Sequence, residues 1–474
     1  MTNAANVQNE IIDILRQQKL ASSVRKLIDE RARLRGREFT ACVITYGCQQ
    51  NENDSERLRG MLSGMGYTNV SDRRGADLVV FNTCAVREGA EMRLFGNVGA
   101  LVHDKRKNPD MKIAVCGCMM QIEENARKIK MRYPHVDIVF GTHTLARFPE
   151  ILYNALSDDK RAFDVIDTAG HVYEGLPIMR DRSFSANISI MYGCNNFCSY
   201  CIVPFVRGRE RSRRPENIYA EIRGAIKSGA REIMLLGQNV NSYGRDLGGD
   251  IDFSDLLRSI NDIEGDFRIK FMTSHPKDAS EKLFLTMAEC GKVARHLHLP
   301  FQAGDDRVLT AMNRGYTREQ YLNKLARARE LMPDLTVTSD VIVGFPSETE
   351  DEFLNTLKLV REGQFDMLFT FLYSRRPGTP AAAMANQVPR EEKKRRFDML
   401  TELQNEISLK KNQALLGRRL RVLAEGKSRT DPSMMTGRTD GGKTVNFEGA
   451  KELTGEFCDL EIIKANTWSL YGKL

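Results

Sequence analysis

The sequence predicts an α/β protein of three parts: a small open parallel α/β domain, a partial (β/α)6 barrel and a small all-β barrel. Short apolar runs alternate with helical stretches twice, over residues 40–156 and again over 187–374. This alternation is typical of parallel sheets with crossover helices. The last sixty residues carry short strand-like runs between Gly- and Asp-rich turns, which indicates a small barrel.

The first alternation predicts four strands. The apolar runs lie at residues 42–46, 78–81, 113–115 and 137–140, with helical segments between them. A helical extension over residues 1–36 precedes this domain, and the polar, irregular residues 158–184 read as a linker. We expect the first domain to cover residues 38–157.

The second alternation predicts six βα units over residues 180–410. The expected strands are residues 187–191, 232–236, 267–271, 296–299, 336–343 and 368–372. Helices are expected over residues 215–228, 349–362 and 390–413. In such a barrel, chemistry belongs at the C-terminal ends of the strands. The third domain, residues 411–474, has expected strands at 420–424, 444–447 and 457–463.

Composition places the chain in a reducing compartment. No apolar run of about 18 residues is present, so we expect no membrane span. The N-terminus lacks the apolar core of a secretory signal, so we expect the cytoplasm. The ten cysteines are therefore expected to be free, metal-bound or catalytic rather than disulfide-bonded.

The sharpest motif is GCNNFCSYC, residues 193–201, with C-x3-C-x2-C spacing directly after an expected strand. Three thiolates on one short loop can bind three irons of a [4Fe–4S] cluster and leave the fourth open. A zinc site would need a fourth protein ligand, and none is nearby in sequence. Cys194, Cys198 and Cys201 are the expected ligands.

A second set of cysteines is dispersed along the first domain. Cys48, Cys84 and Cys118 each follow an expected strand. Ligands of open α/β sheets bind outside the carboxyl ends of the strands, so the fold can bring these thiols to one rim. The structural alternative is that each is a small buried residue, which we expect for Cys42, Cys116, Cys290 and Cys458.

Arginines follow the cysteine loop at every second position: Arg207, Arg209, Arg211 and Arg213. On an extended segment this spacing places side chains on one side. We expect Arg207, Arg209 and Arg213 to bind RNA phosphates, for which guanidinium offers a bidentate fork. A solvated surface is the alternative, and the net charge of +7 is too small to decide.

These motifs resemble the radical S-adenosylmethionine superfamily and, within it, the methylthiotransferase family. The resemblance covers residues 38–474, and residues 437–449 (GRTDGGKTVNFEG) look like part of a TRAM domain, a small RNA-binding barrel. Three strings resemble the branch that acts on isopentenyladenosine in tRNA: NTCAVREGAEMR, MYGCNNFCSYCIVPFVRGRERSR and LLGQNVNSYG. The Gly-Cys pair of the family motif selects Cys118 over Cys116.

The resemblance implies two [4Fe–4S] clusters and S-adenosylmethionine as methyl donor and radical source. The Cys194 cluster would chelate the methionine moiety, and Tyr200 would approach the adenine through its backbone. Strand-end residues expected around this cofactor are Gly237, Gln238, Asn239, Gln302 and Asp340. The dispersed cluster would hold the transferable sulfur, and no catalytic side chain is assigned.

The implied reaction converts N6-isopentenyladenosine at position 37 of tRNA to its 2-methylthio derivative. The expected partners are the anticodon stem-loop, a reductase, and a sulfur or cluster-repair carrier, with the enzyme itself a monomer. Two alternatives keep the chemistry and change the substrate: threonylcarbamoyladenosine in tRNA, or a ribosomal-protein aspartate. A third, of another class, is a non-catalytic iron–sulfur protein that binds RNA or carries electrons.

Overall fold

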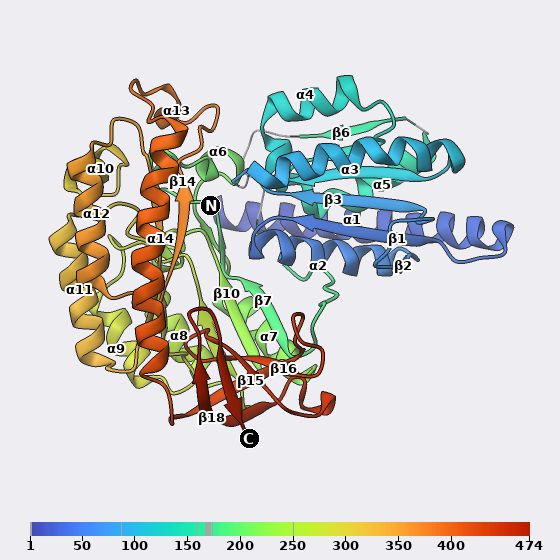
Figure 1. The fold of residues 1–474 in the computed structure, drawn as a ribbon. Helices are drawn as coiled ribbons and strands as arrows, with labels where there is room; N and C mark the ends of the chain where they lie inside the picture. The colour runs from blue at the N-terminus through green and yellow to red at the C-terminus, as the bar shows by residue number, and fades with distance from the viewer. Residues whose placement is uncertain (1, 87, 159, 166–171, 173, 250) are drawn as a thin grey trace. The chain divides into compact units, whose positions relative to one another are not determined.

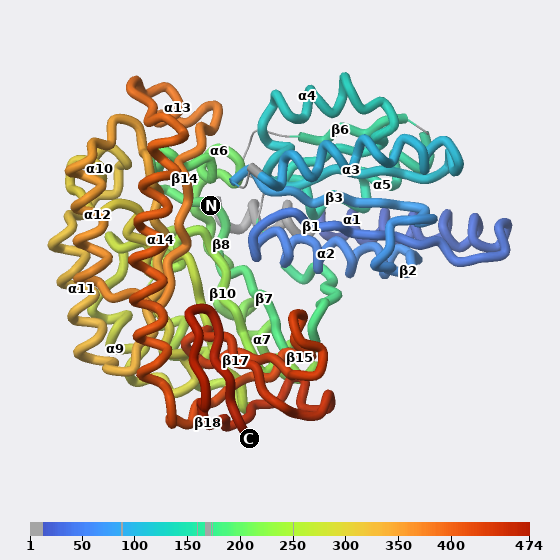
Figure 2. Tube along the Cα trace, in the orientation of Figure 1, coloured from blue at the N-terminus to red at the C-terminus, as the bar shows by residue number. Residues whose placement is uncertain are grey.

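The computed structural model describes residues 2–86, 88–158, 160–165, 172, 174–249 and 251–474 (Figures 1 and 2). The chain forms two compact units. The first unit contains Met1–Asp181, Tyr192–Asn195 and Ile202–Arg211, and the second contains the remaining segments through Leu474. Each unit has hydrophobic clusters of its own.

The first unit is built on a parallel six-stranded sheet of order β2-β1-β3-β4-β5-β6. Every residue of β3 and β4 is buried, as expected for central strands covered on both faces. The order reverses between β1 and β3, which makes this the topological switch point. The strands are β1 (Thr40–Tyr46), β2 (Thr68–Asn69), β3 (Leu78–Thr83), β4 (Lys112–Gly117), β5 (Ile138–Phe140) and β6 (Ala162–Asp164).

Helices cover both faces of this sheet. α1 (Thr2–Arg35), α2 (Gln49–Gly64) and α5 (Phe148–Ser157) share one hydrophobic cluster with it. α3 (Glu88–Lys107) and α4 (Glu123–Arg132) share the other. The N-terminal helix is therefore part of the packing, since its Val24 and Ile28 are fully buried.

The interpretation of residues 158–184 as an irregular linker was wrong in part. Residues 162–164 form β6, which pairs in parallel with β5. The strand is short and lies at the sheet edge, so its register comes from β5 rather than from a hydrophobic pattern of its own. Residues 159, 166–171 and 173 of the predicted linker lie outside the described residues.

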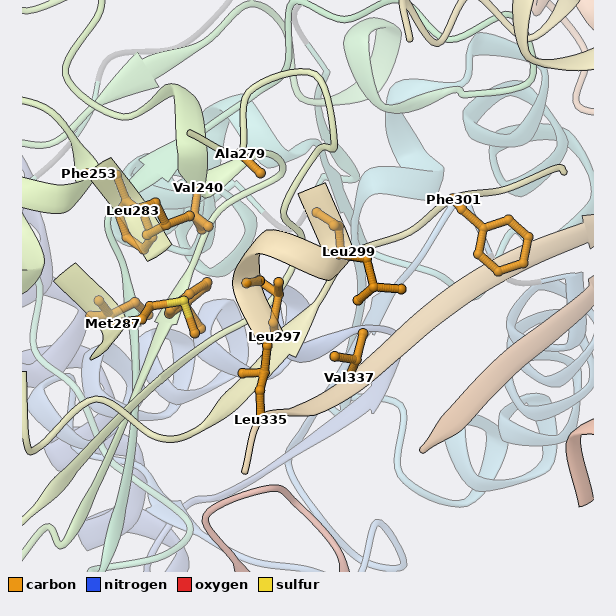
Figure 3. Packing of buried hydrophobic residues seen from close by; sticks show 14 of the residues in the cluster. Val240, Phe253, Ala279, Leu283, Met287, Leu297, Leu299, Phe301, Leu335 and Val337 are labelled. Atoms are coloured by element: carbon orange, nitrogen blue, oxygen red, sulfur yellow. The ribbon is translucent and has the colours of Figure 1, made fainter. Parts of the chain in front are cut away.

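The second unit carries six parallel strands in two three-stranded sheets, β7-β10-β11 and β12-β13-β14. One hydrophobic cluster fills the space between the strands and helices, with side chains such as Leu297, Leu299 and Val337 pointing toward one another (Figure 3). The strands are β7 (Ser185–Ser189), β10 (Glu232–Leu236), β11 (Arg268–Phe271), β12 (His296–His298), β13 (Thr336–Val343) and β14 (Met367–Leu372). Two further strands, β8 and β9, contain two residues each: Met191–Tyr192 and Arg211–Ser212.

Local signals explain where the helices of this unit begin. Pro215 opens α7, which suits its fixed backbone angle. Thr317 and Thr349 close capping boxes at the starts of α11 and α12. The helices are α6 (Val203–Val206, in the first unit), α7 (Pro215–Lys227), α8 (Phe253–Asn261), α9 (Glu281–Glu289), α10 (Asp306–Ala311), α11 (Arg318–Leu331), α12 (Glu350–Gly363), α13 (Pro380–Ala383) and α14 (Arg390–Gln413).

A closed five-stranded barrel ends the chain, in the order β15-β16-β17-β19-β18. It packs at the N-terminal ends of the parallel strands: Arg268 Nη1, at the start of β11, donates to Arg438 O at 2.9 Å, and Lys443 pairs with Asp366 just before β14 at 2.9 Å. The sequence pattern had not predicted β16 and β19. The strands are β15 (Arg419–Lys427), β16 (Met435–Thr439), β17 (Thr444–Phe447), β18 (Phe457–Ala465) and β19 (Leu470–Lys473).

Among the described helices, none combines the length and the apolar character that crossing a bilayer needs.

Candidate active site

The three dispersed cysteines lie at one rim of the first unit's sheet. Cys48 follows β1 and is the N-cap of α2. Cys84 comes directly after β3, and Cys118 directly after β4. All three therefore stand outside the carboxyl ends of neighbouring strands, at the switch point where such sheets bind ligands.

The backbone of this rim is fixed by close contacts. Gly117 has φ of +99°, and a Cβ there would lie 2.4 Å from Thr83 O, so no side chain fits. Two buried amides join the neighbouring loops: Asn51 Nδ2 donates to Asn82 Oδ1 at 3.0 Å, and Asn82 Nδ2 donates to Asn51 O at 2.8 Å. These contacts hold the turns that carry Cys48, Cys84 and Cys118.

The three thiols lie close enough to perturb one another. The Cys84 thiol donates a hydrogen bond to the Cys48 sulfur. This bond, the Arg207 guanidinium and backbone N–H groups at the start of α2 together lower the pKa of Cys48 to about 5, against the effect of burial. The same bond and burial raise the pKa of Cys84. Burial raises the pKa of Cys118, and Arg207 opposes this.

A buried arginine connects this rim to the segment that follows the cysteine loop. Arg207 Nε donates to Cys118 Sγ at 3.1 Å, and its Nη2 donates to Asp54 Oδ2 of α2 at 2.9 Å. The Arg207 side chain is 5% exposed and that of Asp54 is 9% exposed. Thr142 Oγ1 donates to Val206 O at 2.7 Å and holds the same segment.

The prediction that alternate arginines face one side was wrong. Two of the three arginines proposed to bind RNA are buried, which argues against those two contacts. Arg207 and Arg213 are buried, and Arg213 Nη1 donates to Ser189 O and pairs with Glu221 at 2.7 Å. Arg209 is exposed. The segment is not a continuous strand, because α6 and a left-handed Gly208 interrupt it, so period-two spacing does not apply.

The residues of the C-x3-C-x2-C loop divide between the first unit, which contains Cys194, and the second, which contains Cys198 and Cys201. In the first, the Cys194 N–H donates to Gly208 O at 3.1 Å, and Gly193 has φ of +75° with Arg209 O only 2.0 Å from where a Cβ would stand. In the second, Cys201 N donates to Cys198 O at 2.9 Å. Cys194 and Cys198 are buried, and Cys201 is half-buried.

Arg314, which the sequence did not single out, contacts the second-unit part of this loop. Its Nη1 donates to Cys198 Sγ and to the Tyr200 hydroxyl, each at 3.4 Å. Its Nη2 donates to Pro300 O at 2.8 Å, and its Nε to the Tyr316 hydroxyl at 3.2 Å. A fully buried guanidinium thus stands beside a thiol in each cysteine set.

Four of the predicted cofactor residues follow strands of the second unit, whereas Asp340 lies inside β13. Gly237 directly follows β10, and its carbonyl accepts from Thr273 Oγ1 at 2.7 Å; the half-buried Gln238 comes next. Asn239 is buried, donates to Asp278 at 2.7 Å, and keeps Oδ1 without a hydrogen-bond partner among the described residues. Gln302 has φ of +66° and likewise leaves buried Oε1 unpaired there, while Asp340 lies 3.5 Å from His298 Nε2.

Both sites have donor sets that fit the implied cofactors. No group of three or more His, Cys, Asp or Glu in the described part of the chain surrounds a point as a lone metal ion would require. The thiolates of an iron–sulfur cluster bind separate irons and need not meet at one point. The unpaired Asn239 and Gln302 oxygens suit the amino and hydroxyl groups of a bound nucleoside amino acid.

Residues missed from sequence are the partners of the cysteines rather than the cysteines themselves. Asp54, Asn51 and Asn82 stand near motif cysteines but carried no spacing signal. Arg314 is 116 residues from Cys198, so only the folded structure reveals the contact. Cys42, Cys116, Cys290 and Cys458 are buried, as the packing interpretation expects.

Family models match three stretches of the chain. Residues 40–141 match the uncharacterized protein family UPF0004, residues 188–360 the radical SAM superfamily, and residues 413–474 the TRAM domain. These stretches correspond to the parallel sheet of the first unit, the parallel strands of the second and the closed barrel.

Among solved structures, the fold resembles the radical S-adenosylmethionine methyltransferase TsrM from Kitasatospora setae. The structure with cobalamin and a [4Fe–4S] cluster has a TM-score of 0.54 at 13% identity, covering 73% of this chain and 74% of that one. The structure with tryptophan and a cofactor analogue has a TM-score of 0.52 at 14% identity, covering 72% and 75%. At this identity the likeness concerns the fold alone.

Sequence relatives are much closer. The chain is 49% identical over 462 residues to a tRNA-2-methylthio-N(6)-dimethylallyladenosine synthase of Acetivibrio thermocellus, covering 98% of this chain and 96% of the relative. It is 50% identical over 440 residues to the enzyme of the same name from Alkaliphilus oremlandii, covering 93% of both. With the three-part architecture and both cysteine sets in place, the chain belongs to the tRNA-2-methylthio-N(6)-dimethylallyladenosine synthase family.

Proposed function

We propose that this protein is a radical S-adenosylmethionine methylthiotransferase, which converts N6-isopentenyladenosine at position 37 of tRNA to its 2-methylthio derivative. The observation that carries the proposal is half identity over nearly the whole chain to enzymes named for this reaction. The alternatives with threonylcarbamoyladenosine or a ribosomal-protein aspartate share the chemistry, but the two relatives described above are named for the isopentenyladenosine reaction.

Two cysteine sets divide the cofactors. Cys194, Cys198 and Cys201 would hold one [4Fe–4S] cluster. S-adenosylmethionine would bind beside it, near Gly237, Gln238, Asn239, Gln302 and Asp340. Cys48, Cys84 and Cys118 would hold the second cluster. Bound there, these groups supply the radical and the sulfur that an unactivated aromatic C–H at carbon 2 of adenine requires.

The chain's own residues hold and shield these groups. The buried strand ends exclude water from the Cys198 side, where Arg314 and Tyr200 fill the space beside the thiol. At the other rim, the Asn51–Asn82 amide pair fixes the loops and Arg207 supplies a positive charge beside Cys118.

The RNA contacts are proposed for surfaces rather than for the buried arginines. The C-terminal barrel belongs to a domain type that binds RNA, and Arg209 is the exposed arginine of the original three. Sequence-specific RNA recognition favours loops whose bases can splay out, so the target is expected in the anticodon loop. A reductase, a sulfur or cluster-repair carrier, a cytoplasmic location and a monomeric state complete the proposal.

Nucleoside analysis of tRNA from cells lacking the protein tests substrate and reaction together. The proposal predicts loss of the 2-methylthio group with accumulation of isopentenyladenosine. Loss of 2-methylthio-threonylcarbamoyladenosine, or of a modified ribosomal-protein aspartate, would assign the other substrates. Failure of the reduced, reconstituted protein to produce methionine and 5′-deoxyadenosine would indicate a non-catalytic protein.

A further inference from the structure

Arg207 occupies a position that neither the family models nor the relatives' names explain. It comes six residues after Cys201 in the sequence, yet its guanidinium is buried in the first unit beside Cys118. Burying a charge is costly unless it is paired and hydrogen-bonded. A buried arginine therefore needs a compensating role in the folded protein.

We propose that Arg207 is a positioning residue for the cluster held by Cys48, Cys84 and Cys118. The inference rests on the proposed function in one respect, namely that these cysteines hold an iron–sulfur cluster. Arg207 would orient Cys118 and offset the negative charge of the cluster and its thiolates. RNA phosphates would then be bound elsewhere.

Geometry is the first support. One guanidinium donates through Nε to Cys118 Sγ at 3.1 Å and through Nη2 to Asp54 Oδ2 at 2.9 Å. Asp54 lies on α2, the helix whose N-cap is Cys48. A single planar group thus ties the loop that carries Cys118 to the helix that begins at Cys48, and only arginine offers such a rigid fork.

Charge is the second support. Arg207 places a buried positive charge at this rim, with its Nε 3.1 Å from Cys118 Sγ. Asp54 offsets part of that charge, because its carboxylate accepts from Nη2, on the same edge of the guanidinium as the sulfur-bonding Nε. Hydrogen bonds to cluster sulfurs and nearby charge set the potential of iron–sulfur centres.

The anchoring of the segment is the third support. Arg211 Nη2 donates to Arg207 O at 3.0 Å, and Thr142 Oγ1 donates to Val206 O at 2.7 Å. Ile202 and Val206 share a hydrophobic cluster with Cys118 and Ala85. The backbone around Arg207 is therefore held against the cysteine rim independently of the guanidinium.

The test uses the full chain with Cys194, Cys198 and Cys201 replaced by alanine, so that only the cluster in question remains. Arg207→Met, Arg207→Lys and the exposed neighbour Arg209→Met are reconstituted in this background. Iron content, resistance to a chelator and the midpoint potential from an EPR-monitored titration are measured. Replacing an outer-shell partner of a metal ligand typically weakens metal binding about 10- to 100-fold.

We expect Arg207→Met to lose iron to the chelator about 10- to 100-fold more readily and to shift the potential of the remaining cluster downward, because a cation favours the reduced form. Arg207→Lys should restore the potential in large part, since it keeps the charge, and Arg209→Met should match the parent. Equal iron retention and potential in Arg207→Met and Arg209→Met would overturn the inference. So would a change confined to tRNA affinity and its salt dependence.

Two controls keep the outcomes distinct. If Arg207→Met does not fold, the double variant Arg207→Met/Asp54→Asn removes the buried carboxylate left unpaired. Because an anion leaves with the cation, the readout there is iron retention: Cys118 has still lost its hydrogen-bond donor, so we expect faster loss of iron to the chelator than in the parent, and parent-like retention overturns the inference. If the parent with Arg207 intact holds no iron, the assignment of a cluster to Cys48, Cys84 and Cys118 is wrong. The inference then fails because its premise fails.

Discussion

Arg314 donates a hydrogen bond from Nη1 to the sulfur of Cys198 at 3.4 Å. The same guanidinium is 4% exposed and reaches two tyrosine hydroxyls and the Pro300 carbonyl. Burial and these contacts place a permanent positive charge beside a cysteine of the C-x3-C-x2-C motif. The arrangement parallels that of Arg207 at Cys118 and leads to the first prediction.

Replacing Arg314 with methionine should destabilise the second unit. Removing the buried guanidinium takes away the donor to the Tyr200 and Tyr316 hydroxyls, and we expect a loss of about 2–4 kcal/mol in the free energy of unfolding. Iron content should fall as well, because Cys198 loses its neighbour. Arg327→Met on the exposed face of α11 is the control. Denaturant titration measures the effect, and equal midpoints for the two variants would contradict it.

The iron content of the reconstituted protein follows from two three-cysteine sets. We expect about eight irons per chain, as two four-iron clusters. Replacing Cys194, Cys198 and Cys201 together with alanine should leave about half of them. Replacing the buried packing residues Cys42 and Cys290 with alanine serves as the control and should retain all the iron. An iron content unaffected by the triple substitution would refute the assignment of that loop.

The two cysteine sets should differ in what their loss abolishes. Replacing Cys48, Cys84 and Cys118 together is expected to spare reductive cleavage of S-adenosylmethionine but to end methylthio transfer. The reason is structural: these cysteines lie in the first unit, whereas Cys198, Cys201 and the predicted cofactor residues lie in the second, with a separate hydrophobic cluster. Product analysis alongside 5′-deoxyadenosine measurement separates the activities. Methylthiolated product at the normal rate would place the sulfur source elsewhere.

Arg209 is the remaining candidate for phosphate contact after the cysteine loop. Arg209→Gln should weaken tRNA binding and flatten the dependence of affinity on salt by roughly one unit, as expected for one lost phosphate contact. Binding measured at several salt concentrations gives this slope. Arg327→Gln makes the same change of charge on α11 and should leave the slope as in the parent. Identical slopes for both variants would exclude Arg209 from the RNA site.

Asp366 predicts a pH-dependent stability. Burial alone would raise the pKa of this carboxyl, but Lys443 of the barrel and Lys411 of α14, at 2.9 and 2.8 Å, lower it below its ordinary value. A depressed pKa contributes stability above the unfolded value of about 3.9 and loses it as the pH falls through the folded value. Asp366→Asn should therefore cost about 3 kcal/mol at pH 7.

The difference between Asp366→Asn and the parent should begin to shrink below about pH 4, where the carboxyl of the unfolded parent takes up a proton before that of the folded parent does. Melting temperatures of both proteins across this range give the measurement, and their difference cancels the titration of other groups. A constant difference from pH 7 to pH 3 would show that the loss does not come from the charge of Asp366.

The sequence predicted the elements whose hydrophobic pattern is self-contained. β10 (Glu232–Leu236) and β13 (Thr336–Val343) coincide with their expected ranges. For β10 the reason is that a buried parallel strand reads as a nearly continuous apolar run. β6 and the barrel strand β19 were missed, since each is short and defined by its neighbour. The strand-end positions of Cys48, Cys84 and Cys118 followed from the alternation of strands and helices alone.

What the sequence could not provide was the environment of single side chains. Arg207 reads as one of several alternating arginines, yet it contacts residues 89 and 153 positions away. Its burial depends on α6, which turns the segment inward. A four-residue helix is too short to give a recognisable sequence pattern. Alternating arginines share one exposed surface only if the backbone is extended, and the backbone here is not extended.

The closed C-terminal barrel touches the parallel strands where they begin, at Arg268 and Asp366, whereas the Cys198–Arg314 contact lies where they end. The eight residues of β13 set the separation between these two ends at roughly 26 Å, at about 3.3 Å per residue. An RNA bound at the barrel must span that distance to place a base at the cysteines. The length of the second unit thus sets the length of RNA that can contact both ends. A free nucleoside or a very short oligonucleotide would bind at one end without reaching the other.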